Sequence, residues 1–569
     1  MVIASQAGQP TADPSPSPQP GGSFDPSSPA LWWRGAAIYE IYPRSFSDAD
    51  GDGTGDLAGV RQRLRYLSDL GVDAVWFTPW YPSPMADGGY DVSDYRAIDP
   101  SYGTLGQAEE LIAAAAELGI RTIVDVVPNH VSDQHPWFQA ALHAPAGSAE
   151  RQRFWFRPGR GVDGDEPPNG WISEFGGRAW TRTRNPDGSP GEWYLHLFAP
   201  GQPDLNWGHS EVRLEHEEVL RFWFDRGVAG IRIDSAALLV KDPDLPEVGD
   251  RPEPGEHPYI DRDELQEIYR SWRVVANSYD DRALIGELWL SDPDRFIRYL
   301  RPDVLNSAFN FDFLVCPWDA GRLRAAIEET IAVHGRVGAP ATWVLSNHDV
   351  TRPVTRYGRA DTSFAFGDKR YGIPTDLDIG RRRARAAALL TMALPGCVYI
   401  YQGEELGLPE VEDLPPDRLQ DPMHFRSSGV DPGRDGCRVP LPWSGEEPPY
   451  GFSPRASADL WLPQPKDWAD LTVELQERDP SSTLSLYRSA LQLRREHPSL
   501  GDGDMGWLST APDVLGITRG GDFACVVNFG LEPVTLPPHD QVLLASDEML
   551  KGGRLPADTA AWIRLPAGP

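Results

Sequence analysis

Apolar and polar positions follow two alternating patterns along this chain. Short β-branched or aromatic runs predict strands at residues 36–42, 74–77, 121–127, 229–234, 283–288, 307–313, 341–347 and 397–401. Longer amphipathic segments predict helices at residues 57–70, 105–118, 211–226, 264–279 and 483–497. Strands that alternate with helices are typical of a parallel sheet, and eight such strands predict a (β/α)8 TIM barrel.

Three stretches depart from this alternation. Residues 129–205, rich in Gly, Pro and aromatic residues, are too long for a plain loop and predict an inserted domain after the third strand. Residues 403–470 are rich in Pro and acids and predict an excursion over the barrel mouth. From residue 501 to 569, short alternating runs predict a C-terminal antiparallel β domain. The barrel would then comprise residues 31–128 and 206–500.

Four of the predicted strands end in acidic, basic or His residues. One such motif fits a structural ion pair as well as a functional site, but four in order favour an active site. The carboxyl ends of the strands converge at one face of a (β/α)8 barrel, where catalytic groups gather. In chain order these motifs carry His130, Arg232, Asp234, Glu287, His348 and Asp349.

The chemistry of these groups favours glycoside hydrolysis. The motifs contain no Ser or Cys nucleophile and lack the HExxH spacing of a metal site. Paired carboxylates suit glycosidases, because one attacks the anomeric carbon and the other protonates the leaving oxygen. Arg232, two residues before Asp234, would keep that acid ionised by charge pairing. Trp289 beside Glu287 would lower the local polarity and raise the pKa of that carboxyl toward that of a general acid.

An acidic loop, DADGDGTGD at residues 48–56, predicts a metal site. Its carboxylates recur at every second position around a Gly turn, as at the start of an EF-hand calcium loop. Gly59 stands where that loop has a bidentate Glu. We expect a structural Ca2+, with Mg2+ as the alternative, and no organic cofactor. The ligands would be Asp48, Asp50, Asp52, Asp56 and the carbonyl of Thr54.

Composition narrows the partners and the compartment. A formal charge of -31 argues against nucleic acid or an anionic membrane as a partner. Four Cys without metal spacing suggest free thiols in a reducing compartment, so we expect a cytoplasmic protein. We also expect a monomer or a small homo-oligomer. Residues 1–30 lack the basic and apolar regions of a signal peptide and predict a disordered leader. No apolar run approaches membrane-spanning length.

Taken together, the motifs DVVPNH, GIRIDSA, GELW and LSNHD resemble, in order and spacing, the signature regions of the α-amylase superfamily, glycoside hydrolase family 13. QPDLN at residues 202–206 resembles its fifth region. AIYEIYPRSF, the acidic loop, DGGYDVSDY and GRDGCRVPLPW resemble the α-glucosidase and oligo-1,6-glucosidase branch. The likeness covers residue 32 to about 500. It implies a (β/α)8 barrel with an inserted domain B after strand 3 and a C-terminal domain C.

The resemblance implies a role for each residue at the strand ends. Asp234 would be the nucleophile that forms a covalent glucosyl-enzyme, and Glu287 the acid that then activates water. Asp349 would bind the 2- and 3-hydroxyls of the sugar. The supporting residues would be Arg232, which orients Asp234, together with His130 and His348, which bind hydroxyls. We expect Asn129 to have a structural role.

In that branch an Asp–Arg pair closes the sugar pocket behind the non-reducing end. The Asp is Asp87 of the DGGY motif, and we expect Arg438 as its partner, with Arg434 as the alternative. A closed pocket implies exo-action on a small oligosaccharide. The other pocket residues would be Tyr90, under the sugar ring, and Phe198 and Gln202 in the wall.

The residue after the nucleophile bears on the linkage. In related enzymes Val there accompanies α-1,6 preference and smaller residues α-1,4, so Ser235 favours maltose and malto-oligosaccharides. Residues 439–441 (VPL) depart from the Thr-Pro-Met common in the branch. A transglucosylase or isomerase of the trehalose synthase or sucrose-acting type stays open as the alternative. A non-catalytic protein of the same fold is disfavoured by the retained acids, and a longer-chain amylase by the Asp87 pair.

Overall fold

Eight parallel strands form the barrel in the computed structural model, which describes residues 31–185, 187–249 and 252–566. The predicted leader, residues 1–30, lies outside the described residues. The strand order is β10-β11-β1-β2-β3-β7-β8-β9. The bounds are β1 Ala37–Ile41, β2 Ala74–Phe77, β3 Arg121–Val126, β7 Gly230–Ile233, β8 Ala283–Gly286, β9 Ser307–Ala308, β10 Thr342–Val344 and β11 Cys397–Tyr401.

Two strands of this order, β9 and β10, are not paired through their backbones, so the barrel is nearly closed. A side-chain hydrogen bond of 2.8 Å between the hydroxyls of Ser307 and Thr342 bridges them. Cys397 on β11 lies 3.3 Å from the Thr342 hydroxyl. The predicted (β/α)8 fold is confirmed, because every other neighbouring pair is parallel.

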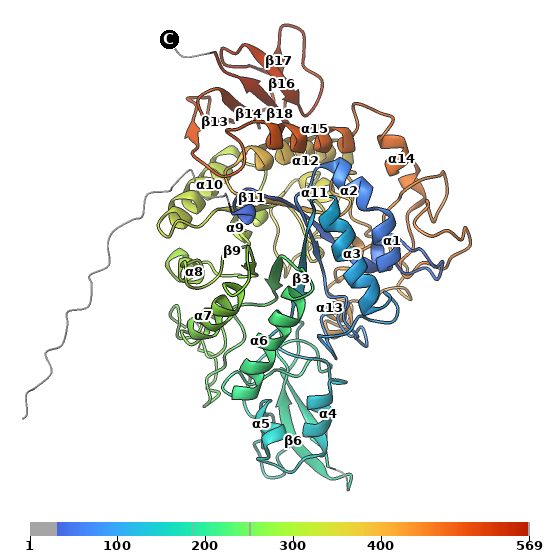
Figure 1. Ribbon diagram of the computed structural model, residues 1–569, viewed down its shortest axis with the longest axis vertical. Coiled ribbons are helices and arrows are strands. Elements are labelled where there is room, and N and C mark those ends of the chain that lie inside the picture. The colour runs from blue at the N-terminus through green and yellow to red at the C-terminus, as the bar shows by residue number, and fades with distance from the viewer. Residues whose placement is uncertain (1–30, 186, 250–251, 567–569) are drawn as a thin grey trace, which may run out of the picture.

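Helices surround the strands (Figure 1). They are α1 Leu57–Gln62, α2 Leu64–Leu70, α3 Leu105–Glu117, α6 Ser210–Phe224, α7 Leu265–Ala276, α8 Pro293–Tyr299, α10 Ala320–Gly335, α12 Leu377–Ala393 and α15 Thr483–Glu496. Helix α7 shows why they pack: Leu265, Ile268, Trp272 and Val275 are buried and recur every three or four residues. Among the described residues, no helix is long and apolar enough to cross a membrane.

Two predicted elements differ from the structure. The strand predicted at 307–313 ends at Ala308, and helix α9, Phe311–Val315, follows it. The side chain of Asn310 accepts a hydrogen bond from the Phe313 amide, so it caps this helix and stops the strand. The helix predicted at 57–70 is divided into α1 and α2 at Arg63.

An inserted segment between β3 and β7 forms its own small sheet. Its antiparallel strands have the order β4-β6-β5 and span Phe156–Arg157, Pro190–Leu195 and Trp180–Arg184 respectively. The buried residues Trp155, Trp171, Trp180 and Trp193 form a hydrophobic cluster there. Helices α4, Pro136–His143, and α5, Ala149–Gln152, accompany the sheet at the end of the molecule away from the C-terminal strands (Figure 1).

The C-terminal segment is an antiparallel β domain that packs against α12 and α15 (Figure 1). The Trp562 indole N–H donates to the Leu389 carbonyl of α12 at 3.0 Å. Its five-stranded sheet has the order β12 Gly506–Trp507, β13 Val514–Arg519, β14 Phe523–Asn528, β18 Thr559–Arg564 and β16 Gln541–Ala545. Strands β15, Val534–Thr535, and β17, Arg554–Leu555, pair separately. The segment between β11 and α15 is largely irregular, with short helices α13 Pro422–Arg426 and α14 Val473–Gln476.

Candidate active site

A cavity of about 390 Å³ lies over the carboxyl ends of the barrel strands. Walls from the inserted segment and from the segment after β11 enclose it, through Phe175, Phe198 and Met423 among others. Seven of the ten predicted catalytic and substrate-binding residues line it, namely Asp87, Tyr90, His130, Phe198, Asp234, Glu287 and Asp349. The other three, Arg232, His348 and Arg438, are buried behind them.

Arg232 connects the two candidate catalytic carboxylates. Its side chain is 2% exposed. Nη1 lies 2.7 Å from Asp234 Oδ1, and Nη2 lies 2.5 Å from Glu287 Oε2. Nη1 also donates to both oxygens of Asp125 on β3, at 2.9 and 3.1 Å. One guanidinium therefore holds three carboxylates from three adjacent strands.

The two carboxyls have raised but different pKa values. Burial raises the pKa of Asp234 to about 6, against the lowering effect of Arg232. Burial raises the pKa of Glu287 to about 7, again opposed by Arg232 and supported by the charge of Asp234. Glu287 therefore keeps its proton to a higher pH than Asp234, which favours an ionised Asp234 beside a protonated Glu287. That is the state a nucleophile and a general acid need.

Hydrogen bonds hold the Glu287 carboxyl in place. Ser235 has a left-handed backbone, with φ at 46°, and its amide donates to Glu287 Oε2 at 3.0 Å. The Trp289 indole N–H donates to Oε1 at 3.2 Å. Trp289 is thus a hydrogen-bond donor to Glu287, and burial of the whole site, more than this ring, raises the pKa of that carboxyl.

Asp349 has a lowered pKa, in contrast to Asp234 and Glu287. Burial alone would raise its pKa, but His348, Arg434 and Arg438 hold the pKa well below its usual range. Its Oδ1 lies 3.0 Å from Arg434 Nη1 and 2.8 Å from Arg438 Nη2. Behind it, His348 Nδ1 lies 2.5 Å from Glu40 Oε1 of β1. Asp349 is therefore a permanent anion that accepts hydrogen bonds.

The expected pair of Asp87 with Arg438 is wrong, and Arg434 is the partner. Arg434 Nη2 lies 2.6 Å from Asp87 Oδ1, and Arg434 Nε lies 2.6 Å from Asp421 Oδ2. Arg438 follows the short helical turn 435–437 and donates from Nε to the His348 carbonyl at 2.8 Å. That turn directs Arg438 to the end of β10, so it contacts Asp349 and not Asp87.

The expected wall residues lie together on one side of the cavity. Gln202 Nε2 lies 3.1 Å from Asp87 Oδ2 and 3.0 Å from His130 Nε2. Burial lowers the pKa of His130 to about 4, so its ring is neutral. The Phe198 ring packs against His130 at 5.0 Å. Tyr90 stacks on His348 at 5.2 Å and lines the cavity beneath them.

Asn129 belongs to a buried network that includes His130, whose Nδ1 lies 3.1 Å from the Asn129 side-chain nitrogen. Its Oδ1 accepts a hydrogen bond from the Lys241 ammonium at 2.6 Å. Lys241 also pairs with Asp204 at 2.7 Å, and both side chains are fully buried. This Asn ties the inserted segment to the strand ends and does not line the cavity.

The acidic loop gathers three of its four predicted carboxylate ligands. Carboxylate oxygens of Asp48, Asp50 and Asp56 lie within 4.8 Å of one another. Asp52 is outside that group, and the Thr54 carbonyl stays a predicted ligand. Asp56 also caps α1 by accepting a hydrogen bond from the Gly59 amide. An all-oxygen set of this kind fits a hard divalent cation such as Ca2+.

Sequence reasoning missed several residues of the site. Asp125 lies inside the DVVPNH motif, and Glu40 is the one acid in an otherwise apolar strand. Both could have been identified from the sequence, because an acid in a buried strand needs a partner. At the cavity wall, Glu174 and Phe366 come from irregular segments and Met423 from the short helix α13. No periodicity or motif marks these three positions.

With this geometry in view, comparison with known proteins identifies the family. The α-amylase catalytic domain matches residues 40–503, and a domain of unknown function, DUF3459, matches residues 514–562. The chain belongs to the α-amylase family, glycoside hydrolase family 13, and is a glycoside hydrolase of its α-glucosidase group.

Three similar proteins illustrate the range of the family. A probable α-glucosidase of Rhizobium meliloti (strain 1021) is 37% identical over 512 residues, 86% of this chain and 87% of that protein. A trehalose-6-phosphate hydrolase of Escherichia coli (strain K12) is 36% identical over 500 residues, 82% of this chain and 85% of that protein. The crystal structure of an α-glucosyl transfer enzyme, XgtA, has a TM-score of 0.82 at 33% identity and covers 95% of this chain and all of its own.

Proposed function

We propose that this protein is a retaining, exo-acting α-glucosidase that releases glucose from the non-reducing end of short α-glucosides. The observation that carries the proposal is the Arg232 bridge between Asp234 and Glu287. Asp234 attacks the anomeric carbon while Glu287 protonates the leaving oxygen. Glu287, now ionised, takes a proton from water, which then releases glucose with net retention. Asp349, held ionised, binds hydroxyls of the distorted sugar.

Exo-action follows from the closed end of the cavity. Arg434 spans Asp87 and Asp349 and is anchored by Asp421. This ion-pair cluster blocks further sugar units behind the terminal glucose. His130 lines the same wall, and the buried Gln202 lies within hydrogen-bonding distance of both His130 and Asp87. A chain therefore enters with its non-reducing end first and loses one glucose at a time.

The charge of the cavity favours neutral substrates. Five acids line it, namely Asp87, Glu174, Asp234, Glu287 and Asp349. Arg434 is the only basic side chain, Lys or Arg, among the described lining residues, and it already pairs with three carboxylates. A phosphorylated disaccharide would meet uncompensated negative charge. Together with the small Ser235, this supports neutral α-1,4 glucosides such as maltose over trehalose 6-phosphate.

A second candidate is a transglucosylase of the same family. Its support is the apolar outer wall, where Phe175, Ile260, Phe366 and Met423 line the cavity with Trp289. Apolar rings favour a sugar or alcohol acceptor over water. The two functions share all catalytic residues and differ only in what captures the glucosyl-enzyme.

One experiment tests these functions together. The enzyme is incubated with maltose, isomaltose, sucrose, trehalose or trehalose 6-phosphate, and the products are followed by chromatography and by NMR of the anomeric proton. Glucose from maltose, first formed as the α-anomer, supports the glucosidase; new oligosaccharides support the transferase. First-formed β-glucose, or preference for trehalose 6-phosphate, would contradict the proposal. Asp234→Asn and Glu287→Gln, each folded but several orders of magnitude slower, complete the test.

We further propose that the acidic loop binds Ca2+ in a structural role. The grouped oxygens of Asp48, Asp50 and Asp56 support this. Asp50 is exposed and Asp56 caps α1, so the ion would tie a surface loop to the start of a barrel helix.

A further inference from the structure

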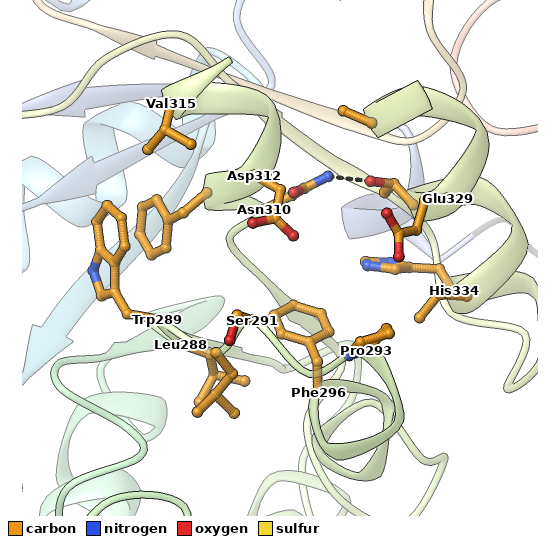
Figure 2. Close-up of a pocket in the computed structure, with 15 residues that line it drawn as sticks. Leu288, Trp289, Ser291, Pro293, Phe296, Asn310, Asp312, Val315, Glu329 and His334 are labelled. Atoms are coloured by element: carbon orange, nitrogen blue, oxygen red, sulfur yellow. Dashed lines mark hydrogen bonds between the residues drawn. The ribbon is translucent and has the colours of Figure 1, made fainter. Parts of the chain in front are cut away.

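A second cavity, of about 560 Å³, lies beside the catalytic one, and Figure 2 shows the residues that line it. It is enclosed by the loop after β8 and by helices α8, α9 and α10. Trp289 lines both cavities. Its ring stacks on Phe311 with centroids 3.6 Å apart and planes 2° apart, while its N–H donates to Glu287. One stacked aromatic pair thus separates this side cavity from the catalytic acid.

A buried His334 offers a hydrogen-bond acceptor to the side cavity. The residue is 3% exposed, and its Nδ1 lies 2.9 Å from the Pro340 carbonyl oxygen. Because a carbonyl only accepts, Nδ1 must carry the proton and Nε2 the free lone pair. Burial lowers the pKa of His334, which keeps the ring neutral. Nε2 has no hydrogen-bond partner among the described residues, and the ring faces the cavity (Figure 2).

Two carboxylates, of Asp312 and Glu329, face the same cavity (Figure 2). Within the described part of the chain, neither forms an ion pair, and no Lys or Arg lines this cavity. Although Asp312 is an exposed residue, partial desolvation of its carboxyl and the neighbouring charge of Glu329 raise its pKa. Asn310 and Thr330 satisfy each other through a hydrogen bond of 2.6 Å. The charged and imidazole groups left without partners are therefore all acceptors.

Apart from Ser291, the remaining walls are apolar, with Leu288, Leu290, Phe296, Val315 and Val333 among them. A single metal ion does not fit the three acceptors. Among the described residues, only Asp48, Asp50 and Asp56 bring three such ligand atoms within 4.8 Å of one another, so Asp312, Glu329 and His334 are too far apart. A neutral sugar would leave both carboxylates uncompensated. The complementary ligand is a donor-rich cation larger than a metal ion, with an apolar part for the walls.

We propose that the side cavity binds a protonated amine carrying an apolar group, and that the bound amine changes turnover through Trp289 and Glu287. The ammonium group would donate to Asp312 and Glu329, and charge-assisted hydrogen bonds of this kind are the strong ones. The apolar group would displace water from the side-chain walls. An occupant that moves the Trp289–Phe311 stack also moves the indole N–H that holds Glu287. This goes beyond the proposed function and does not depend on which glucoside is cleaved.

The test uses benzylammonium as the probe and benzyl alcohol as its neutral counterpart. Binding is measured by calorimetry, and kinetics with maltose are followed at increasing benzylammonium. The key protein is the double variant Asp312→Asn/Glu329→Gln, whose two carboxylates are exposed and serve no internal pair. The matched control is Glu328→Gln. Glu328 directly precedes Glu329 on α10, and its carboxylate pairs with Arg324 at 3.0 Å.

We expect wild type and Glu328→Gln to bind benzylammonium, and the double variant to bind it at least tenfold more weakly. Benzyl alcohol should bind measurably to none of the three proteins. Benzylammonium should change kcat at saturating maltose in wild type and not in the double variant, whose kcat without the amine stays at the wild-type value. Equal affinity in the double variant would overturn the site. Strictly competitive inhibition would place the amine in the catalytic cavity and would also overturn the proposal.

Discussion

Replacing Glu287 by Gln should make the folded protein more stable at neutral and alkaline pH while it abolishes turnover. The Glu287 carboxyl is 8% exposed, and burial raises its pKa from 4.5 to about 7. Above pH 7 the folded protein must hold this group as a buried anion that Arg232 shares with two other carboxylates. A neutral amide of the same shape removes that unfavourable charge.

The sign and size follow from proton linkage. Because the pKa is raised on folding, the folded protein binds the proton more tightly, and the contribution of Glu287 to stability falls as the pH rises from 4.5 to about 7. The shift of roughly 2.5 units corresponds to about 3 kcal/mol above pH 7. For a chain of this length unfolding entropy is about 1 kcal/mol per kelvin, so Tm should rise by about 3 °C.

The assay is thermal unfolding of wild type and Glu287→Gln at pH 5 and pH 8. At pH 5 both folded proteins carry an uncharged group, so their curves should nearly coincide, and the gain should emerge at pH 8. Asp349→Asn is the control of opposite sign. His348, Arg434 and Arg438 lower the pKa of Asp349 despite its burial, so its ionised form stabilises the fold and the variant should melt lower at pH 8. A Glu287→Gln gain that is equal at both pH values would refute the reasoning.

Three further predictions follow. Arg434→Met should lower kcat/KM for maltose at least a hundredfold and destabilise the protein by about 3 kcal/mol or more, since it leaves buried carboxylates unpaired; a milder effect than that of Arg438→Met would contradict the assignment of the pair. Chelation should lower Tm and Ca2+ should restore it if loop 48–56 holds the ion; a melting curve indifferent to chelator removes the site. Glu40→Leu should raise KM for maltose because His348 loses its partner, whereas Glu40→Gln should largely restore it; equal kinetic effects would show that Glu40 does not position His348.

The repeating pattern made most of the barrel predictable. Strands β2 and β11 coincide with the predicted residues 74–77 and 397–401, because short apolar runs between turns have few other buried arrangements. The predicted strand at 307–313 failed for a local reason. Its aromatic residues fit a strand and a buried helix turn equally well, and the cap at Asn310 decided between them.

The candidate site, like the barrel, was only partly predictable from the sequence. Asp234, Glu287 and Asp349 were predictable because each ends a strand, and parallel strands bring their ends together. The choice between Arg434 and Arg438 was not. They flank one short helical turn, residues 435–437, and which of them reaches Asp87 depends on how that turn winds, a tertiary feature without periodicity. The side cavity likewise depends on the packing of α8 against α10.

The number of positive charges around each carboxyl explains why one cavity supports two kinds of acid. Arg232 is a single guanidinium shared by Asp125, Asp234 and Glu287, so burial outweighs it and the pKa of all three is raised. Asp349 lies against two arginines, Arg438 and the shared Arg434, both supplied by the segment after β11. The barrel strands therefore provide carboxyls that can exchange a proton near neutral pH. The irregular segment provides the charge that fixes Asp349 as an anion, and the same Arg434 closes the cavity at Asp87.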